Sequence, residues 1–148
     1  MDSKHGQEIN KHFKALDLEL NEAIMHGPDG VDREMFSVAW ESLGSWRPTI
    51  ITWSVRKLSR LVGDAPADKH TFLTNYVDFL FCMIGARDIA MASDIMMMSI
   101  TKNDDIQLAK EILEIGRGSP YKTEKKIEAL RLGMSGMHYY SPLKLIYS

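Results

Sequence analysis

The sequence predicts an all-α fold: a single compact bundle of six to seven helices that ends in a short apolar C-terminal tail. Apolar residues recur at helical spacing along nearly the whole chain, and no stretch before residue 137 alternates as a strand does. Glycine and proline clusters separate these segments without forming a linker long enough to divide domains. The length of 148 residues suits one core, so we expect residues 1–148 to form a single helical domain.

The first expected helix covers residues 3–25. Its apolar residues follow one another at steps of three and four, which places them on one face: Ile9, Phe13, Leu16, Leu20 and Ala23. Leu18 and Ile24 lie off this line, and we expect them to widen it. The sequence GPDG at residues 27–30 favours a turn and ends the helix.

Two shorter helices follow. Asp32 is a suitable N-cap for a helix over residues 33–43, which Gly44 ends. A third helix is expected over residues 48–62, because a proline fits its first turn and Gly63 follows it.

The next two expected helices are the most apolar. Asp68 is a candidate cap for a helix that extends to residue 84 and contains the run VDFLFCMI. Because this run is apolar on almost every side, we expect it to form the central, buried helix of the bundle. A methionine-rich helix is expected over residues 87–100.

Residues 116–123 read GRGSPYKT, which approaches the P-loop pattern of glycine, four residues, glycine, lysine and serine or threonine. Tyr121 occupies the place of the second glycine, and Pro120 removes an amide that such a loop needs for phosphate. We therefore interpret the segment as a helix boundary. A sixth helix starts at residues 103–105 and ends at Gly116 and Gly118, and Ser119 caps a seventh over residues 120–132.

The helix boundary at residues 116–123 also allows a second, weaker functional interpretation. A helix N-terminus beside several cations can receive an anion or a phosphodiester backbone. The candidate anion-binding residues are Arg117, Lys122, Lys125 and Lys126.

Charge is segregated along the chain. Residues 1–32 contain three lysines against seven carboxylates, whereas residues 45–63 contain four cations and no acid. At about 100° per residue, the apolar side chains Ile51, Val55 and Leu58 share one face of the third helix, and the cations lie opposite them around an indole. The candidate binding residues are Trp53, Arg56, Lys57, Arg60 and, earlier in the chain, Arg47.

Three interpretations of this basic face stay open. Cations around an aromatic ring suit phosphate contacts with base stacking, and they equally suit an acidic protein partner. Alternatively, the first helix covers Trp53 and the cations are only solvated.

The C-terminal residues 137–148 are unusually apolar for a chain terminus. We expect this tail to dock on its own bundle or on a neighbouring copy, as a self-association element that uses Tyr139, Tyr140, Leu143, Ile146 and Tyr147.

Several function classes find little support in the sequence. The single cysteine excludes an internal disulfide, and the five histidines lack the spacing of a metal site. No local signature of a nucleophile or a catalytic base occurs, so we expect no catalytic residues, metal or cofactor, and no small-molecule substrate is inferred. Without a signal peptide or an apolar run long enough to span a bilayer, we expect a protein of the cytoplasm, or of a host cytosol, with no membrane partner.

The sequence therefore predicts a non-enzymatic helical binding or assembly protein that acts through protein–protein contacts and self-association into a homo-oligomer. The alternative is a structural, nucleocapsid-like protein that binds nucleic acid through the basic helix face. A small enzyme without a recognisable motif is the third hypothesis.

Overall fold

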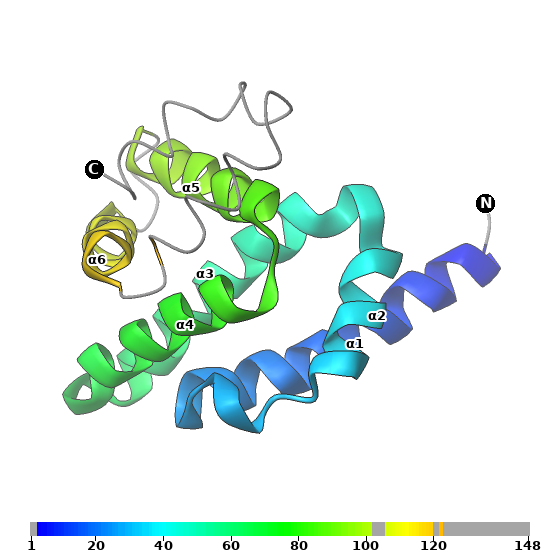
Figure 1. Ribbon diagram of the computed structural model, residues 1–148, viewed down its shortest axis with the longest axis horizontal. Coiled ribbons are helices and arrows are strands. Elements are labelled where there is room, and N and C mark those ends of the chain that lie inside the picture. The colour runs from blue at the N-terminus through cyan, green and yellow to red at the C-terminus, as the bar shows by residue number, and fades with distance from the viewer. Residues whose placement is uncertain (1–2, 102–105, 120–121, 123–148) are drawn as a thin grey trace.

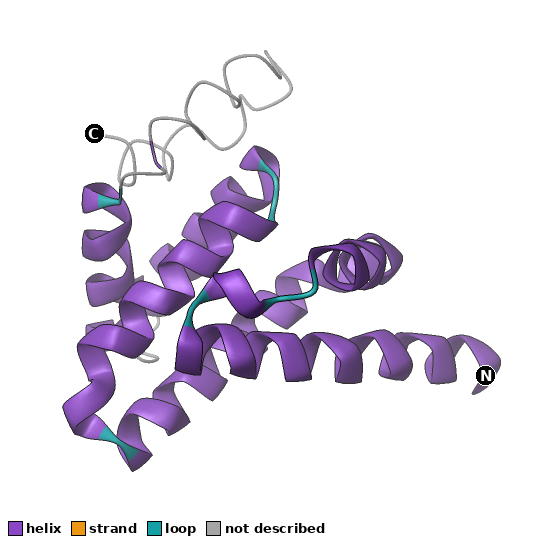
Figure 2. Cartoon of the chain, turned by 60° about the horizontal axis from the view of Figure 1, so that its bottom comes forward, coloured by secondary structure: helices purple, strands orange, loops and turns teal. Residues whose placement is uncertain are grey.

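The structure is a computed structural model that describes residues 3–101, 106–119 and 122 of the chain. Within this part, every regular element is a helix and short loops join the helices (Figure 2), which confirms the all-α prediction. The helix predicted over residues 120–132 and the tail over residues 137–148 lie outside the described residues, so the predicted number of helices is not settled.

The α-helices in chain order are α1 (Ser3–His26), α2 (Arg33–Leu43), α3 (Arg47–Asp64), α4 (Lys69–Met83), α5 (Ala86–Thr101) and α6 (Ile106–Gly118). Single turns of 3₁₀ helix join some of them, namely η1 (Pro28–Gly30), η2 (Gly44–Trp46) and η3 (Pro66–Asp68).

Some of the helix ends predicted from glycine residues are correct and others are not. Gly44 has a φ of 51° and ends α2 as predicted, because this backbone conformation suits glycine. Gly63, by contrast, lies inside α3, since the bond from the Ala65 amide to the Leu61 carbonyl at 3.0 Å carries the helix past it. Gly116 also lies inside α6, on its buried side, whereas Gly118, the other glycine predicted to end this helix, is its last residue.

The predicted central helix is confirmed in α4, which contacts α1, α2, α3 and α6. Its buried side chains are Phe72, Leu73, Tyr76, Val77, Phe79, Leu80 and Phe81. The Tyr76 hydroxyl lies 2.6 Å from the Ser54 hydroxyl, which donates to the Ile51 carbonyl at 2.7 Å. Burial raises the pKa of the Tyr76 phenol far above its usual value, so this core hydroxyl stays protonated.

Helix α1 packs against α2 and α4 through its apolar seam. Ile24 widens that seam as predicted, since it is fully buried. Leu18 does not: it is 71% exposed. It follows the buried Leu16 by two residues, or about 200° around the helix, and so points away from the core.

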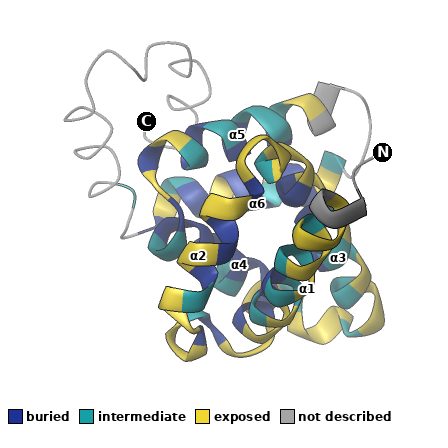
Figure 3. Ribbon diagram, turned by 90° about the vertical axis from the view of Figure 1, so that its right-hand side faces the viewer, coloured by how far each residue is buried: buried dark blue, intermediate teal, exposed yellow. Residues whose placement is uncertain are grey.

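The arrangement leaves two ends of the molecule well separated. The N-terminal half of α1 lies at one end and α6 at the other (Figure 1). Buried residues gather where the helices face one another, and exposed residues follow the outward sides of α1 and α6 (Figure 3). Surfaces on α1 and on α6 can therefore be changed independently.

The two predicted aspartate caps differ in the structure, which gives a first testable prediction. Asp32 accepts from the Met35 amide at 3.0 Å, whereas the Asp68 side chain makes no capping bond. We expect Asp32→Ala to lower the free energy of unfolding by about 1 kcal/mol, because an unpaired amide is left at the start of α2. Asp68→Ala should cost no more than about 0.5 kcal/mol, the scale of an exposed charge near a helix N-terminus. Urea denaturation of both variants measures this, and equal losses would contradict the assignment.

Candidate functional site

The predicted basic face lies on α3, where the structure divides its residues between two environments. Trp53 and Lys57 lie on the flank that α1 covers, and both are partly buried. Arg56 and Arg60 point outward and are exposed. The helical wheel placed these four residues on one face, but only the two arginines of that face are exposed to solvent.

Contacts with α1 hold Trp53 and Lys57. The Trp53 ring lies 4.5 Å from the Phe13 ring, centroid to centroid, in a tilted arrangement. Lys57 donates to Asp17 at 2.6 Å, and its ammonium lies 5.4 Å from the centre of the Trp53 ring. Because the indole and the ammonium bind α1, they hold the fold together and leave little of the ring for stacking on a base.

Arg56 and Arg60 are one helical turn apart, about 6 Å along the axis. Neither forms an ion pair with any of the residues that the structure describes. Thr52 extends their exposed stripe by another turn. What remains of the predicted face is thus a short cationic stripe that could contact phosphate or an acidic side chain.

Arg47 belongs to a separate cluster that ties α2, α3 and α5 together. Its Nε donates to the Trp40 carbonyl at 3.0 Å, and one terminal nitrogen donates to Glu41 at 2.9 Å. The guanidinium carbon also lies 5.7 Å from the Trp40 ring centre. Asp88 completes the cluster by accepting from the Trp40 indole nitrogen at 2.8 Å. With these contacts Arg47 acts as a link within the fold.

The weaker anion site is described only in part. Arg117 donates to Glu114 at 3.1 Å on α6, and the Lys122 amide bonds to the Ser119 carbonyl at 3.3 Å. Lys125 and Lys126 lie outside the described residues, as do the tail residues Tyr139, Tyr140, Leu143, Ile146 and Tyr147.

A groove between α1 and α2, which the sequence did not predict, opens on the surface of the described part. It has a volume of about 390 Å³. Its lining residues are Lys11, His12 and Ala15 of α1, Glu34, Met35, Val38 and Ala39 of α2, and the capping Asp32. Val38 stands 58% exposed at its edge, whereas Ala39 is buried beneath. The groove therefore has an apolar middle and charged sides.

The two sides of this groove, which we call the α1 wall and the α2 wall, differ in charge. On the α1 wall, the partly buried His12 lies 3.6 Å from Glu8, and Lys11 is the exposed cation among the lining residues. On the α2 wall, Asp32 caps the helix, and Asp32 and Glu34 are both exposed anions. The sequence carries no signature of this groove, because its walls come together only when α1 and α2 pair.

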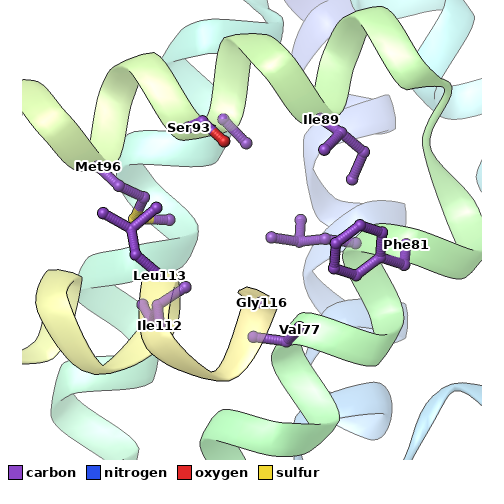
Figure 4. A pocket seen from close by; sticks show the side chains of 10 residues that line it. Val77, Phe81, Ile89, Ser93, Met96, Ile112, Leu113 and Gly116 are labelled. Atoms are coloured by element: carbon purple, nitrogen blue, oxygen red, sulfur yellow. The ribbon is translucent and has the colours of Figure 1, made fainter. Parts of the chain in front are cut away.

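A small cavity between α4, α5 and α6 is a different kind of space (Figure 4). It holds about 20 Å³, enough for one water molecule, and apolar side chains line it except at Ser93. The Ser93 hydroxyl is buried and has no hydrogen-bond partner among the described residues. A second cavity of about 20 Å³ lies among α1, α2, α3 and α4, and Leu80 lines both. Spaces of this size belong to core packing.

Two carboxyl groups away from the groove have perturbed protonation. Burial raises the pKa of Asp78 on α4, and the negative charge of Asp29 adds to the shift. Burial alone raises the pKa of Asp94 on α5. Because the folded chain favours their protonated forms, these two groups lower stability as the pH rises above the ordinary range of aspartate.

The described part of the chain was also examined for metal-binding groups and for helices that could span a membrane. No group of three or more histidine, cysteine, aspartate or glutamate residues there is placed to hold a metal ion. None of the helices described combines the length and the apolar character that crossing a bilayer requires.

Comparison with known proteins gives no matching family model, no matching curated protein and no matching solved structure. Inference about function therefore rests on the surfaces of this chain.

Proposed function

We propose that this chain is a non-enzymatic binding or assembly protein that acts through protein–protein contacts. The observation that carries the proposal is the groove between α1 and α2, about 390 Å³ in volume, with Val38 exposed at its edge. An apolar centre surrounded by polar and charged residues is the usual anatomy of a protein interface. Met35 in its lining adds an adaptable side chain of the kind that protein-binding grooves use.

Large apolar side chains that face solvent support the same proposal. Leu18 is 71% exposed and follows Ala15, a lining residue, by three positions on α1. It extends the apolar surface of the α1 wall by one turn. Scattered exposed apolar residues need no explanation, but two of them beside one groove favour a contact surface.

Parts of the proposal concern residues that the structure does not describe. We include in it a complete bundle of six to seven helices and a self-association role for the tail over residues 137–148. Removal of residues 138–148 tests that role: the tail idea fails if the shortened chain keeps both its oligomeric mass and its thermal midpoint.

The second candidate function is nucleic-acid binding through the exposed stripe of Arg56 and Arg60. The observation that favours it is the lack of an ion pair at either guanidinium within the described part of the chain. Packing of Trp53 against Phe13 weighs against it, because little of that indole is then left for base stacking.

Affinity capture from a lysate of the source organism tests the proposal, with and without nuclease. We expect the wild-type chain to retain protein after nuclease treatment, and the Leu18→Gln, Val38→Gln double variant to lose it. Met98→Gln is the matched control, since Met98 is 52% exposed on α5. The groove is not the binding surface if the double variant retains the same proteins as the wild type. Binding that nuclease and the Arg56→Glu, Arg60→Glu variant both abolish would favour the nucleic-acid function.

A further inference from the structure

We infer that the groove between α1 and α2 is a two-fold contact between two copies of this chain. The inference rests on the proposed function and specifies its partner. Its basis is the unequal charge of the two walls, with Lys11 on one side of the apolar middle and Glu34 on the other.

A groove with oppositely charged walls is complementary to itself. When two copies face each other across a two-fold axis that runs along the groove, the α1 wall of each copy lies against the α2 wall of the other. The α1 wall of each copy, with Lys11, then lies against the α2 wall of its partner, with Glu34, so the contact brings walls of opposite charge together. A two-fold axis across the groove would instead oppose like walls, and charge repulsion disfavours that arrangement.

The apolar side chains fit the same geometry. Val38 projects from the α2 wall with 58% of its surface exposed, and the α1 wall presents the small side chain of Ala15. In the arrangement that the charges select, Val38 of one copy lies over Ala15 of the other, a large side chain against a small one. Leu18 lies one turn further along α1, where a second copy would cover it.

Charge reversal at the two positions tests this contact in the full-length chain. Lys11→Glu sets a carboxylate against the anionic α2 wall of the other copy, and Glu34→Lys sets an ammonium against its cationic α1 wall, so each variant alone opposes like charges across the contact. We expect each to weaken self-association about tenfold or more at low salt, because symmetry applies every change twice. An equimolar mixture of the two variants should associate again, since both pairs between unlike copies are then attractive.

Sedimentation velocity at several concentrations measures each variant and the mixture. Lys110→Glu on α6 is the matched control, because it makes the same change in charge on an exposed residue at the other end of the molecule. Recovery in the mixture cannot arise from an ion pair within one chain. In each variant the residues at positions 11 and 34 have the same charge, so they can attract only the other variant. Thermal midpoints close to that of the wild type establish that the variants are folded.

The outcomes separate this inference from the proposed function. Self-association that both charge reversals leave unchanged overturns the two-fold groove contact, while assembly through another surface such as the tail stands. A wild-type chain that is monomeric at every concentration, yet captures a different protein through Leu18 and Val38, also overturns it. A mixture that stays dissociated rules out the apposition of the α1 wall to the α2 wall.

Discussion

Replacing Phe79 with alanine is expected to lower the free energy of unfolding by about 3–5 kcal/mol, because the lost transfer energy adds to that of a new cavity. Phe79 is only 4% exposed on α4, and its ring meets the Phe36 ring edge-on at a centroid distance of 5.1 Å. Phe36 stacks in turn on Trp40 at 5.8 Å. The substitution therefore removes the end of an aromatic row that joins α2 to α4.

Chemical denaturation at fixed pH measures the loss. Phe13→Ala deletes the same atoms at a half-buried position, so its cost should be clearly smaller. A loss below about 1 kcal/mol for Phe79→Ala would show that α4 is peripheral to stability, contrary to the packing described above.

Replacing Asp88 with alanine is expected to cost roughly 2–3 kcal/mol. The carboxylate accepts from the indole of Trp40, a residue that is 5% exposed, at 2.8 Å. Its removal leaves a buried donor without a partner, and the bond that is lost was to a charged acceptor. The substitution also removes the carboxylate whose oxygen lies 3.8 Å from one terminal nitrogen of Arg47.

Two related variants identify the cause of that loss. Asp88→Asn keeps an acceptor oxygen for the indole and should cost roughly half as much as Asp88→Ala. In a Trp40→Phe background the donor is absent, so Asp88→Ala should cost less there than in the wild type. Equal costs in both backgrounds, measured by denaturation, would contradict the role assigned to the indole bond.

The helices could be predicted from the sequence because each carries its own periodic signal. The apolar steps of α1, the cap at Asp32 and the nearly continuous apolar run of α4 are local properties, and the structure confirms them. Gly63 and Gly116 were named as helix ends but lie inside α3 and α6, for a related reason. The local cost of a helical glycine is only about 1 kcal/mol, so hydrogen bonding and packing can outweigh it.

The candidate site could be predicted much less well, because it depends on which helices become neighbours. The helical wheel placed Trp53 and Lys57 opposite the buried side of α3 without showing that α1 covers them. The groove has no signature of its own, since Ala15 and Val38 are ordinary helix residues that come together only when α1 pairs with α2. Charge complementarity between its walls became visible only in three dimensions.

The two small cavities that share Leu80 bear on how the chain should respond to hydrostatic pressure. Voids inside a folded protein are eliminated when water surrounds the unfolded chain, so unfolding reduces the total volume and pressure favours it. Here the voids lie on both sides of one helix, with Leu80 of α4 as their common wall. Compression therefore acts most directly on the contacts of α4, the element that temperature and denaturant must also disrupt for the bundle to unfold.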